Sequence, residues 1–495
     1  MDDYKKQTIP QVLEQYRDSD EPAVLCGDET VSYRELLSDA RKIASGIQKR
    51  GIKKGDCVVL RLSRDTVYIR AWLGVLYAGA IQLTFHDGWP EKLIESAMTE
   101  CHPAMVLDDK AIGELLESPD PSDISRLFTD LDGEDPFQII YTSGSTGQPK
   151  GAVNAHLTAV SRTLAAYGDP LPDYFVHNCS RLLLDCSLGF VLSSFCICLC
   201  LLNKKTLVLA RKQDIRTPRA IAECAGKYGV DTIHVTPSYF QQYRSDPAYG
   251  SLFREMKLVM AGSEAVSEQT AHMLTDLSGG ETVFCYGASE IFGPAFFQFG
   301  SEYHGGDICF SAAPSVRETY VLNEQGQAAG IGEEGELCVG GIAGRLGRYL
   351  GSYASSPNFA EHSGLGRLYL TGDIVKRMAD GRFCIVGRKD SMVKLYGMRV
   401  ELGVIESKLR TIPGVLQAAV KVQGEGNEAR LCVWYAAEDQ VSESELRRYL
   451  LASLPNYMVP AFWIRMKELP LNPSGKLDRK ALQWEYLRYQ TTIQI

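Results

Sequence analysis

The chain has 495 residues, of which 45% are hydrophobic and 23% are charged, and its formal net charge at pH 7 is −9. This composition is typical of a soluble globular protein, and the length predicts at least two domains rather than a single core. The negative charge argues against a nucleic-acid-binding surface, although a local pocket on an acidic protein can still be positive and bind a nucleotide.

The N-terminal residues and the cysteines exclude two further classes. The first residues, Met1–Lys6, lack the apolar stretch of a signal peptide, so we expect a cytoplasmic protein. The 14 cysteines form no C-x-x-C pair and no regular framework, so we expect buried thiols rather than disulfides. Three of them alternate within the apolar stretch 195–202, which favours a buried element over a metal site.

The order of the predicted elements indicates an α/β fold. The segment Val31-Ser-Tyr-Arg-Glu-Leu36 opens a run of apolar side chains at helical spacing, and a strand at 57–60 and a helix at 71–80 follow. Asp185 interrupts the apolar stretch 181–202, which is too short to span a membrane and which we interpret as a core helix. Further strands are expected at 104–107, 206–209, 232–235, 257–260 and 282–285. Strands that alternate with helices predict largely parallel sheets covered by helices.

The pattern changes after about residue 315. Short strands at 336–339 and 383–386, separated by glycine-rich turns, predict a compact antiparallel β unit that closes the large domain. A small α+β module follows, with helices at about 401–411 and 443–453 and strands at about 416–422 and 430–436. We therefore expect a large N-terminal domain over residues 1–389 and a small, mobile C-terminal domain over residues 390–495.

The segment Tyr141-Thr-Ser-Gly-Ser-Thr-Gly-Gln-Pro-Lys150-Gly151 carries the strongest functional signal. Its glycines allow backbone amides to approach a ligand closely, and its hydroxyls and lysine add donors for an anion. The apolar strand predicted at 137–140 leads into it, which does not suit a flexible linker. The Walker loop of nucleotide-binding proteins is excluded, because Pro149 precedes Lys150 and Gly151 stands where Ser or Thr is required. We predict a phosphate-binding loop of another kind.

Further motifs follow in a fixed order along the chain. They are Cys285-Tyr-Gly-Ala-Ser-Glu290, Gly335-Glu-Leu-Cys-Val-Gly-Gly341, Arg348-Tyr-Leu350, Tyr369-Leu-Thr-Gly-Asp373, Gly387-Arg-Lys-Asp390, Val393-Lys-Leu-Tyr-Gly-Met-Arg-Val-Glu401 and Asn472-Pro-Ser-Gly-Lys-Leu-Asp-Arg479. With the loop, they resemble the acyl-adenylate-forming (ANL) superfamily, and most of all the amino-acid adenylation domains of nonribosomal peptide synthetases. The resemblance covers about residues 10 to 485. Tyr77-Ala-Gly-Ala80 also resembles a family segment, although Thr84-Phe-His86 replaces the usual Pro and Asp downstream.

The resemblance implies an ATP site and a role for each motif. The phosphates would be held by Thr142, Ser143, Gly144, Ser145, Thr146, Gly147 and Lys150. Tyr286 would stack on adenine, Ser289 would contact the α-phosphate, and Glu290 would bind Mg²⁺, which prefers hard oxygen ligands. Asp373, whose two oxygens only accept hydrogen bonds, would bind the ribose hydroxyls together with Arg388.

The last part of the chain would supply the moving parts. By the resemblance, Asp390 is the hinge about which the small domain rotates, and Gly397 lines a tunnel for a phosphopantetheine thiol. Lys476 would be catalytic, because its compact ammonium suits the two anions that approach each other, the substrate carboxylate and the α-phosphate. Residues 393–401 can equally be a surface hairpin that leads into a helix, and both interpretations can hold in different conformations.

The predicted acid is an amino acid. Asp185 stands where amino-acid adenylation domains carry the aspartate that pairs with the substrate ammonium, and a carboxylate inside an apolar run needs such a partner. A helix N-cap is the alternative role for Asp185. Gly189 suggests a pocket that is open on one side, and His234 is either a polar contact or a core histidine. By motif spacing, the other pocket positions are Cys186, Val259, Ala261, Cys285, Gly293 and Pro294.

These motifs predict an enzyme that forms aminoacyl-AMP from ATP and then loads a carrier protein. Residues 480–495 contain no Gly-Gly-x-Ser attachment site, so we expect the carrier in trans, and we expect neither a nucleic acid nor a membrane as a partner. Three alternatives remain open: an acyl- or aryl-CoA ligase, a stand-alone amide synthetase, and an inactive scaffold subunit. Asp185 counts against the first, and the presence of Lys476, Glu290 and Asp373 counts against the last.

Overall fold

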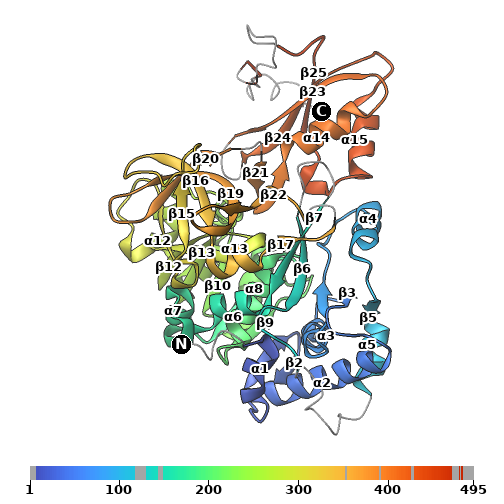
Figure 1. The fold of residues 1–495 in the computed structure, drawn as a ribbon, viewed down its shortest axis with the longest axis vertical. Coiled ribbons are helices and arrows are strands. Elements are labelled where there is room, and N and C mark those ends of the chain that lie inside the picture. Colours follow the sequence, from blue (N-terminus) through green and yellow to red (C-terminus); the bar gives the residue numbers. More distant parts are fainter. Residues whose placement is uncertain are drawn as a thin grey trace. The chain divides into compact units, whose positions relative to one another are not determined.

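The computed structural model describes residues 7–117, 130–142, 149–351, 354–389, 392–424, 428–470, 479 and 481–482 (Figure 1). The chain divides into two compact units. The second consists mainly of the described residues after 390, together with the short segment 88–94 and Pro149. Each unit has a hydrophobic core of its own.

One sheet of the first unit leads to the predicted phosphate loop. Among the described residues it has six strands, in the order β17 (Arg348–Tyr349), β7 (Lys150–Ala155), β6 (Pro136–Thr142), β4 (Ile81–Leu83), β3 (Cys57–Arg61) and β5 (Met105–Asp108). The pairs β5–β3, β3–β4 and β4–β6 are parallel, whereas β6–β7 and β7–β17 are antiparallel. The antiparallel end therefore places the two flanks of the loop, β6 and β7, side by side.

The other sheet of this unit has fourteen strands within the described residues. Its parallel part contains β1 (Pro22–Cys26), β8 (Arg181–Leu184), β9 (Thr206–Leu209), β10 (Thr232–Val235), β11 (Leu258–Gly262) and β12 (Glu281–Ala288), with β2 (Glu29–Ser32) antiparallel at one edge. Its antiparallel part contains β13 (Gly293–Phe299), β14 (Cys309–Ala312), β15 (Thr319–Leu322), β16 (Glu334–Val339), β18 (Phe359–His362), β19 (Gly366–Arg377) and β20 (Phe383–Arg388). The β unit predicted after residue 315 thus continues the large sheet through β14.

Helices cover both sheets, as the α/β pattern predicts. They are α1 (Ile9–Leu13), α2 (Tyr33–Lys49), α3 (Thr66–Tyr77), α4 (Glu91–Cys101), α5 (Asp109–Leu116), α6 (His156–Thr163), α7 (Pro170–Asn178), α8 (Val191–Leu201), α9 (Pro218–Tyr228), α10 (Pro237–Tyr243), α11 (Pro247–Glu255), α12 (Glu268–Leu277) and α13 (Gly341–Leu346). Helix α2 begins where expected, because Ser32 and Glu35 form a reciprocal capping box. Its apolar face packs against α3 and α5, beside which it lies in Figure 1.

The prediction of one core helix over residues 181–202 is wrong. The segment contains the buried strand β8, then a loop, and only then α8, in which ten of the eleven residues are buried. A short apolar strand and a buried helix give the same pattern of hydrophobic residues, so periodicity does not separate them. The N-cap of α8 is Phe190, so Asp185 does not cap this helix. No helix among the described residues is long and apolar enough to cross a membrane.

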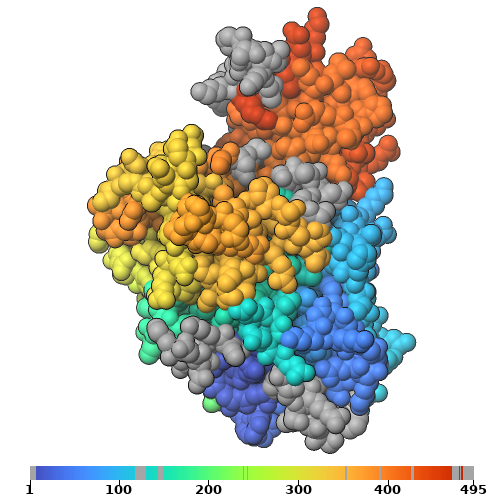
Figure 2. Space-filling view, viewed as in Figure 1, coloured from blue at the N-terminus to red at the C-terminus, as the bar shows by residue number. Residues whose placement is uncertain are grey.

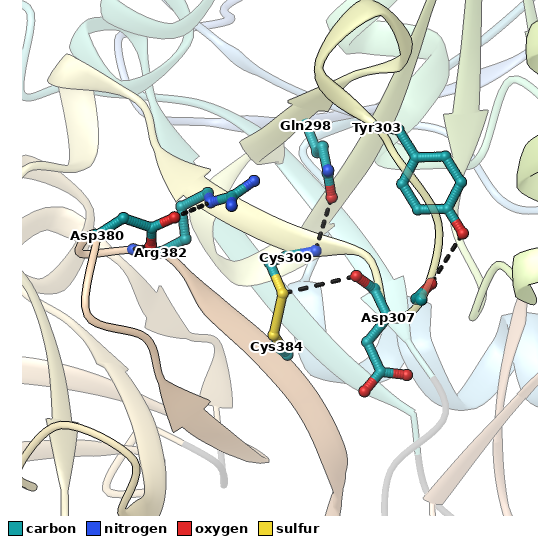
Figure 3. The surroundings of a disulfide bond; sticks show 8 residues. Gln298, Tyr303, Asp307, Cys309, Asp380, Arg382 and Cys384 are labelled. Atoms are coloured by element: carbon teal, nitrogen blue, oxygen red, sulfur yellow. Dashed lines mark hydrogen bonds and ion pairs between the residues drawn. A yellow bond between two sulfur atoms is a disulfide. The ribbon is translucent and has the colours of Figure 1, made fainter.

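The expectation that the cysteines form no disulfide is also wrong at one place. Cys309 on β14 and Cys384 on β20 stand directly opposite each other in antiparallel register, with 4.3 Å between their Cα atoms, and form a disulfide (Figure 3). The Cys309 amide donates to the Gln298 side chain of the neighbouring strand at 2.6 Å. Their separation of 75 residues gave no sign of this pairing. The other twelve cysteines are free thiols, and all but the partly buried Cys186 are buried.

The second unit is the predicted α+β module with one further strand. Its described elements are the hairpin β21 (Met392–Leu395) and β22 (Met398–Glu401), the helices α14 (Leu402–Arg410) and α15 (Glu443–Leu451), and the sheet strands β23 (Val415–Gln423), β24 (Arg430–Ala437) and β25 (Phe462–Arg465). The strand that we did not predict, β25, is parallel to β24. Tyr396 and Gly397 form the two-residue turn of the hairpin, both with positive φ, as such turns require.

Candidate active site

The flanks of the predicted phosphate loop are paired strands. Thr142 is the last residue of β6 and stands opposite Lys150, the first residue of β7. The Thr142 hydroxyl donates a hydrogen bond to the Lys150 carbonyl oxygen at 3.5 Å, and Lys150 is buried. Ser143, Gly144, Ser145, Thr146 and Gly147 lie outside the described residues. The antiparallel pairing of β6 with β7 therefore holds Thr142 and Lys150, the residues that flank the loop, side by side.

The residues predicted to bind adenosine lie together. Arg388 on β20 pairs in register with Asp373 on β19, and its guanidinium donates to Asp373 Oδ1 at 2.7 Å. The Tyr286 hydroxyl, from β12, donates to Asp373 Oδ2. Three motifs that are distant in sequence therefore meet at one carboxylate. Burial and the neighbouring Asp373 carboxylate raise the pKa of Tyr286 well above its usual value, so its hydroxyl stays protonated.

Aromatic side chains surround the Tyr286 ring. Phe296, Phe310 and Phe383 lie with ring centroids 5.5, 5.8 and 6.4 Å from it. Phe310 and Phe383 adjoin Cys309 and Cys384 in the chain and stand opposite each other in the register of β14 and β20. The disulfide therefore cross-links the two strands that supply part of the ring environment of Tyr286.

Ser289 and Glu290 lie in a short helical turn, η5 (Ser289–Ile291), between β12 and β13. Asn154 on β7 donates to the Ser289 carbonyl at 3.0 Å, and buried Arg162 on α6 donates to the Ile291 carbonyl at 3.2 Å. The Tyr349 hydroxyl donates to Glu290 Oε1 at 2.5 Å. Side chains from the six-stranded sheet and from α6 thus hold the turn that carries the predicted Mg²⁺ ligand.

Glu290 fits Mg²⁺ as the single protein ligand of a site that substrate phosphates and water complete. No group of three or more His, Cys, Asp or Glu side chains in the described residues could hold a metal ion by itself. A single carboxylate, however, is sufficient when the remaining ligands are substrate phosphates and water. Glu290, which is only 2% exposed, supplies the hard oxygen ligand for such a shared site.

Asp185 is the most unusual carboxylate of the candidate acid pocket. It follows directly after β8 and is partly exposed. Desolvation raises its pKa to about 6, although Arg64 and the amides of Asp185 and Cys186 act in the opposite direction. Asp185 forms no ion pair with another described residue. The end of β8 therefore carries a desolvated carboxylate that forms no ion pair among the described residues.

Arg64 is a residue that sequence reasoning missed. Its guanidinium donates to the carbonyls of Leu184, Cys186 and Ala210 at 2.6, 2.7 and 2.5 Å, so it holds the backbone on both sides of Asp185. Nothing in the sequence around Arg64 marks this role, because the contacts join residues more than 100 positions apart.

The other predicted pocket residues come from neighbouring strands. Val259 and Ala261 lie on β11, Cys285 on β12, and Gly293 and Pro294 pair with the end of β12. A Cβ atom added to Gly293 would lie 3.5 Å from Phe195 on α8, in ordinary contact. His234 on β10 is buried, and desolvation lowers its pKa to about 4, so it is neutral near pH 7. Strands β8, β10, β11 and β12 are parallel neighbours, which brings their carboxyl ends to one edge of the sheet, where α/β proteins bind ligands.

The expectation of an open pocket beside Gly189 is wrong. A Cβ atom added there would lie 2.4 Å from the His86 amide nitrogen and 2.7 Å from its Cα. The backbone of residues 85–86 therefore fills the space, and the His86 ring packs against Phe190 at 4.4 Å between centroids. Gly189 permits this close approach. His86 belongs to the short segment in which this chain departs from the family pattern.

The three predicted moving parts are described only in part. Gly397 lies at the tip of the β21–β22 hairpin, so the described conformation has the surface hairpin. Asp390 and Lys476 lie outside the described residues, and their roles stay predictions.

Comparison with known proteins agrees with this arrangement. A family model described as "AMP-binding enzyme" matches residues 13–349, which include β6, β7, the Asp185 loop, η5 and Tyr349. The chain belongs to the AMP-binding enzyme family. The resemblance to the acyl-adenylate-forming superfamily is thereby confirmed, and this AMP-binding enzyme is an adenylate-forming ligase whose family uses ATP.

The proteins that are similar in sequence to this AMP-binding enzyme, and the solved structures that are similar to its fold, include nonribosomal peptide synthetases. It is 32% identical over 494 residues to a dimodular nonribosomal peptide synthase of Bacillus subtilis, a match that covers 93% of the chain but 20% of that protein. Its fold is similar to an artificially fused adenylation–PCP di-domain from Klebsiella oxytoca (TM-score 0.80, 20% identity, 93% and 94% covered). It is also similar to o-succinylbenzoate CoA synthetase of Bacillus subtilis (TM-score 0.82, 16% identity, 97% and 98% covered). These structures confirm the α/β fold.

Proposed function

We propose that this AMP-binding enzyme activates an amino acid with ATP as aminoacyl-AMP, releases pyrophosphate, and transfers the aminoacyl group to the phosphopantetheine thiol of a carrier protein supplied in trans. The observation that carries the amino-acid part is Asp185. A desolvated carboxylate with a pKa of about 6 is costly to ionise, and an ammonium group bound beside it removes that cost. The similarity to nonribosomal peptide synthetases supports the carrier as acceptor.

Each site residue has its own role in adenylation. Asp373 and Arg388 bind the ribose, Tyr286 lies against the adenine, and Lys150 faces the departing phosphates. Glu290 would hold Mg²⁺, which would neutralise the charge of the phosphates. Lys476 stabilises the charge that develops between the substrate carboxylate and the α-phosphate. The acid pocket orients the carboxylate by binding the ammonium group at Asp185.

The test is amino-acid-dependent ATP–pyrophosphate exchange with a panel of proteinogenic and nonproteinogenic amino acids. We expect exchange with one amino acid or a small group, and a large loss of apparent affinity in Asp185→Asn. Asp231→Asn is the matched control, because the Asp231 carboxylate accepts hydrogen bonds from the amides of Ser180 and Arg181 at the other end of β8. Exchange supported equally well by the corresponding acids without an α-amino group contradicts the proposal.

The acceptor is tested separately with the amino acid that supports exchange. Thioester on an added carrier protein is the expected product. Preferred transfer to free CoA indicates an acyl-CoA ligase, and preferred transfer to a free amine indicates an amide synthetase. If neither exchange nor nucleotide binding occurs, the chain is a scaffold subunit.

A further inference from the structure

The two charged groups predicted to face the phosphates contact the same side chain. Lys150 Nζ lies 5.6 Å from the centroid of the Tyr349 ring, and the Tyr349 hydroxyl donates to Glu290 Oε1 at 2.5 Å. A cation within about 6 Å of an aromatic face is attracted by the ring quadrupole. Tyr349 therefore binds a cation with its face and an anion with its hydroxyl.

The surrounding structure gives Tyr349 a fixed position. It is 1% exposed, and its short strand β17 pairs with β7, with Tyr349 opposite Ala152. The Leu350 amide donates to the Gly151 carbonyl at 2.8 Å, directly beside Lys150. Phe359 packs edge-on against the Tyr349 ring at 5.5 Å between centroids. In the space-filling view, the orange surface that includes residues near 350 borders a teal surface from an earlier part of the first unit (Figure 2).

The hydroxyl has a specific effect on Glu290. A carboxylate has two oxygens that accept hydrogen bonds, so a donor held at Oε1 fixes the plane of the group and the direction of Oε2. Hydrogen bonds to charged groups are stronger than those between neutral groups. Asn154 and Arg162 hold the backbone of the same turn, whereas Tyr349 holds its functional side chain.

We propose that Tyr349 is a positioning residue that sets the Mg²⁺ ligand Glu290 and the phosphate-binding Lys150 at a fixed separation. This inference rests on the proposed function, because it assigns the nucleotide-bound metal ion to Glu290. The hydroxyl acts on the metal ion, and the aromatic face acts on the phosphate-binding lysine. The two contributions are separable by mutation.

The test measures binding, without amino acid and without turnover. Mn²⁺ binding to the chain in the presence of a non-hydrolysable ATP analogue is followed by EPR, and metal-free binding of the same analogue by calorimetry. Tyr349→Phe removes the hydroxyl and keeps the ring, whereas Tyr349→Leu removes both. Tyr303→Phe is the matched control, because Tyr303 is also a buried tyrosine of the first unit, and its hydroxyl donates to the Gly306 carbonyl at 2.8 Å.

We expect Tyr349→Phe to weaken Mn²⁺ binding roughly tenfold, the effect of losing a hydrogen bond to a charged group, while metal-free analogue binding stays unchanged. Tyr349→Leu should also weaken metal-free binding roughly threefold. Tyr303→Phe should change neither quantity, although both Phe variants should lose a similar few degrees of Tm. Wild-type Mn²⁺ affinity in Tyr349→Phe, or an equal loss in Tyr303→Phe, overturns the role of Tyr349. If the wild-type chain binds no Mn²⁺ with the analogue, the proposed function itself fails.

Discussion

The pKa of Asp185 predicts how the affinity for the amino acid depends on pH. Only the ionised carboxylate pairs with an ammonium group, and its pKa in the ligand-free protein is about 6. About 97% of the carboxylate is ionised at pH 7.5, and about 9% at pH 5. The KM for the amino acid should therefore rise about tenfold between these pH values. The KM for ATP should not follow the same curve.

The same pKa shift gives the expected effect of an Asp185 substitution on the KM for the amino acid. A pKa of about 6 in place of the usual value near 3.9 corresponds to roughly 3 kcal/mol for ionising Asp185 in its pocket. Removing the charge of a buried ion pair costs a comparable free energy, which is a factor of about 100 in binding. Asp185→Asn should therefore raise the KM for the amino acid roughly 100-fold at pH 7.5 and make it independent of pH.

The stability of the ligand-free protein provides an independent check. Between about pH 4 and pH 6 the folded chain binds more protons at Asp185 than the unfolded chain, so this group lowers stability as pH rises. Asp185→Asn should raise the Tm clearly at pH 7.5 and far less at pH 4, where the folded wild type is protonated at this residue and the unfolded chain is about half protonated. Steady-state kinetics and differential scanning calorimetry measure the two effects. A flat KM profile in the wild type, or an equal rise in the KM for ATP, refutes the assignment of Asp185 to the ammonium.

Three further substitutions test other parts of the site. Lys476→Ala should abolish pyrophosphate exchange and leave the Tm unchanged, and near-normal turnover refutes its catalytic role. Gly397→Leu should block thioester formation on the carrier. It should spare pyrophosphate exchange, because leucine at a φ of 75° adds only about 1–2 kcal/mol of backbone strain. Equal loss of both steps removes the case for a thiol tunnel. Gly189→Ala should destabilise the chain by about 1–3 kcal/mol, because its Cβ atom would meet the backbone of residues 85–86; an unchanged Tm means that the two segments are not in close contact.

The sequence predicted well those parts of the fold that local signals determine. The capping box of Ser32 and Glu35 marks the start of α2, and most strands of the parallel sheets lie within one or two residues of their predicted positions. Periodicity failed over residues 181–202, where a buried strand and a buried helix share one apolar composition. Strand β25 was missed because only four residues form it, three of them half-buried and one exposed.

The candidate site likewise contains residues that the sequence motifs predicted and contacts that they did not. Motif resemblance named Tyr286, Asp373 and Arg388, and the register of β19 with β20 explains why two of them meet. The contacts of Arg64, the approach of residues 85–86 to Gly189, and the pairing of Cys309 with Cys384 depend on the packing of distant segments. Tyr349 lay within a recognised segment, yet its contacts with Lys150 and Glu290 depend on the pairing of β17 with β7. No local pattern encodes such contacts.

A crystal structure of the chain with a non-hydrolysable aminoacyl-adenylate analogue tests the proposed function directly. We expect adenine against Tyr286, ribose hydroxyls on Asp373, and the ammonium group of the analogue on Asp185. Adenosine bound at any other place, or an ammonium group that does not contact Asp185, contradicts it.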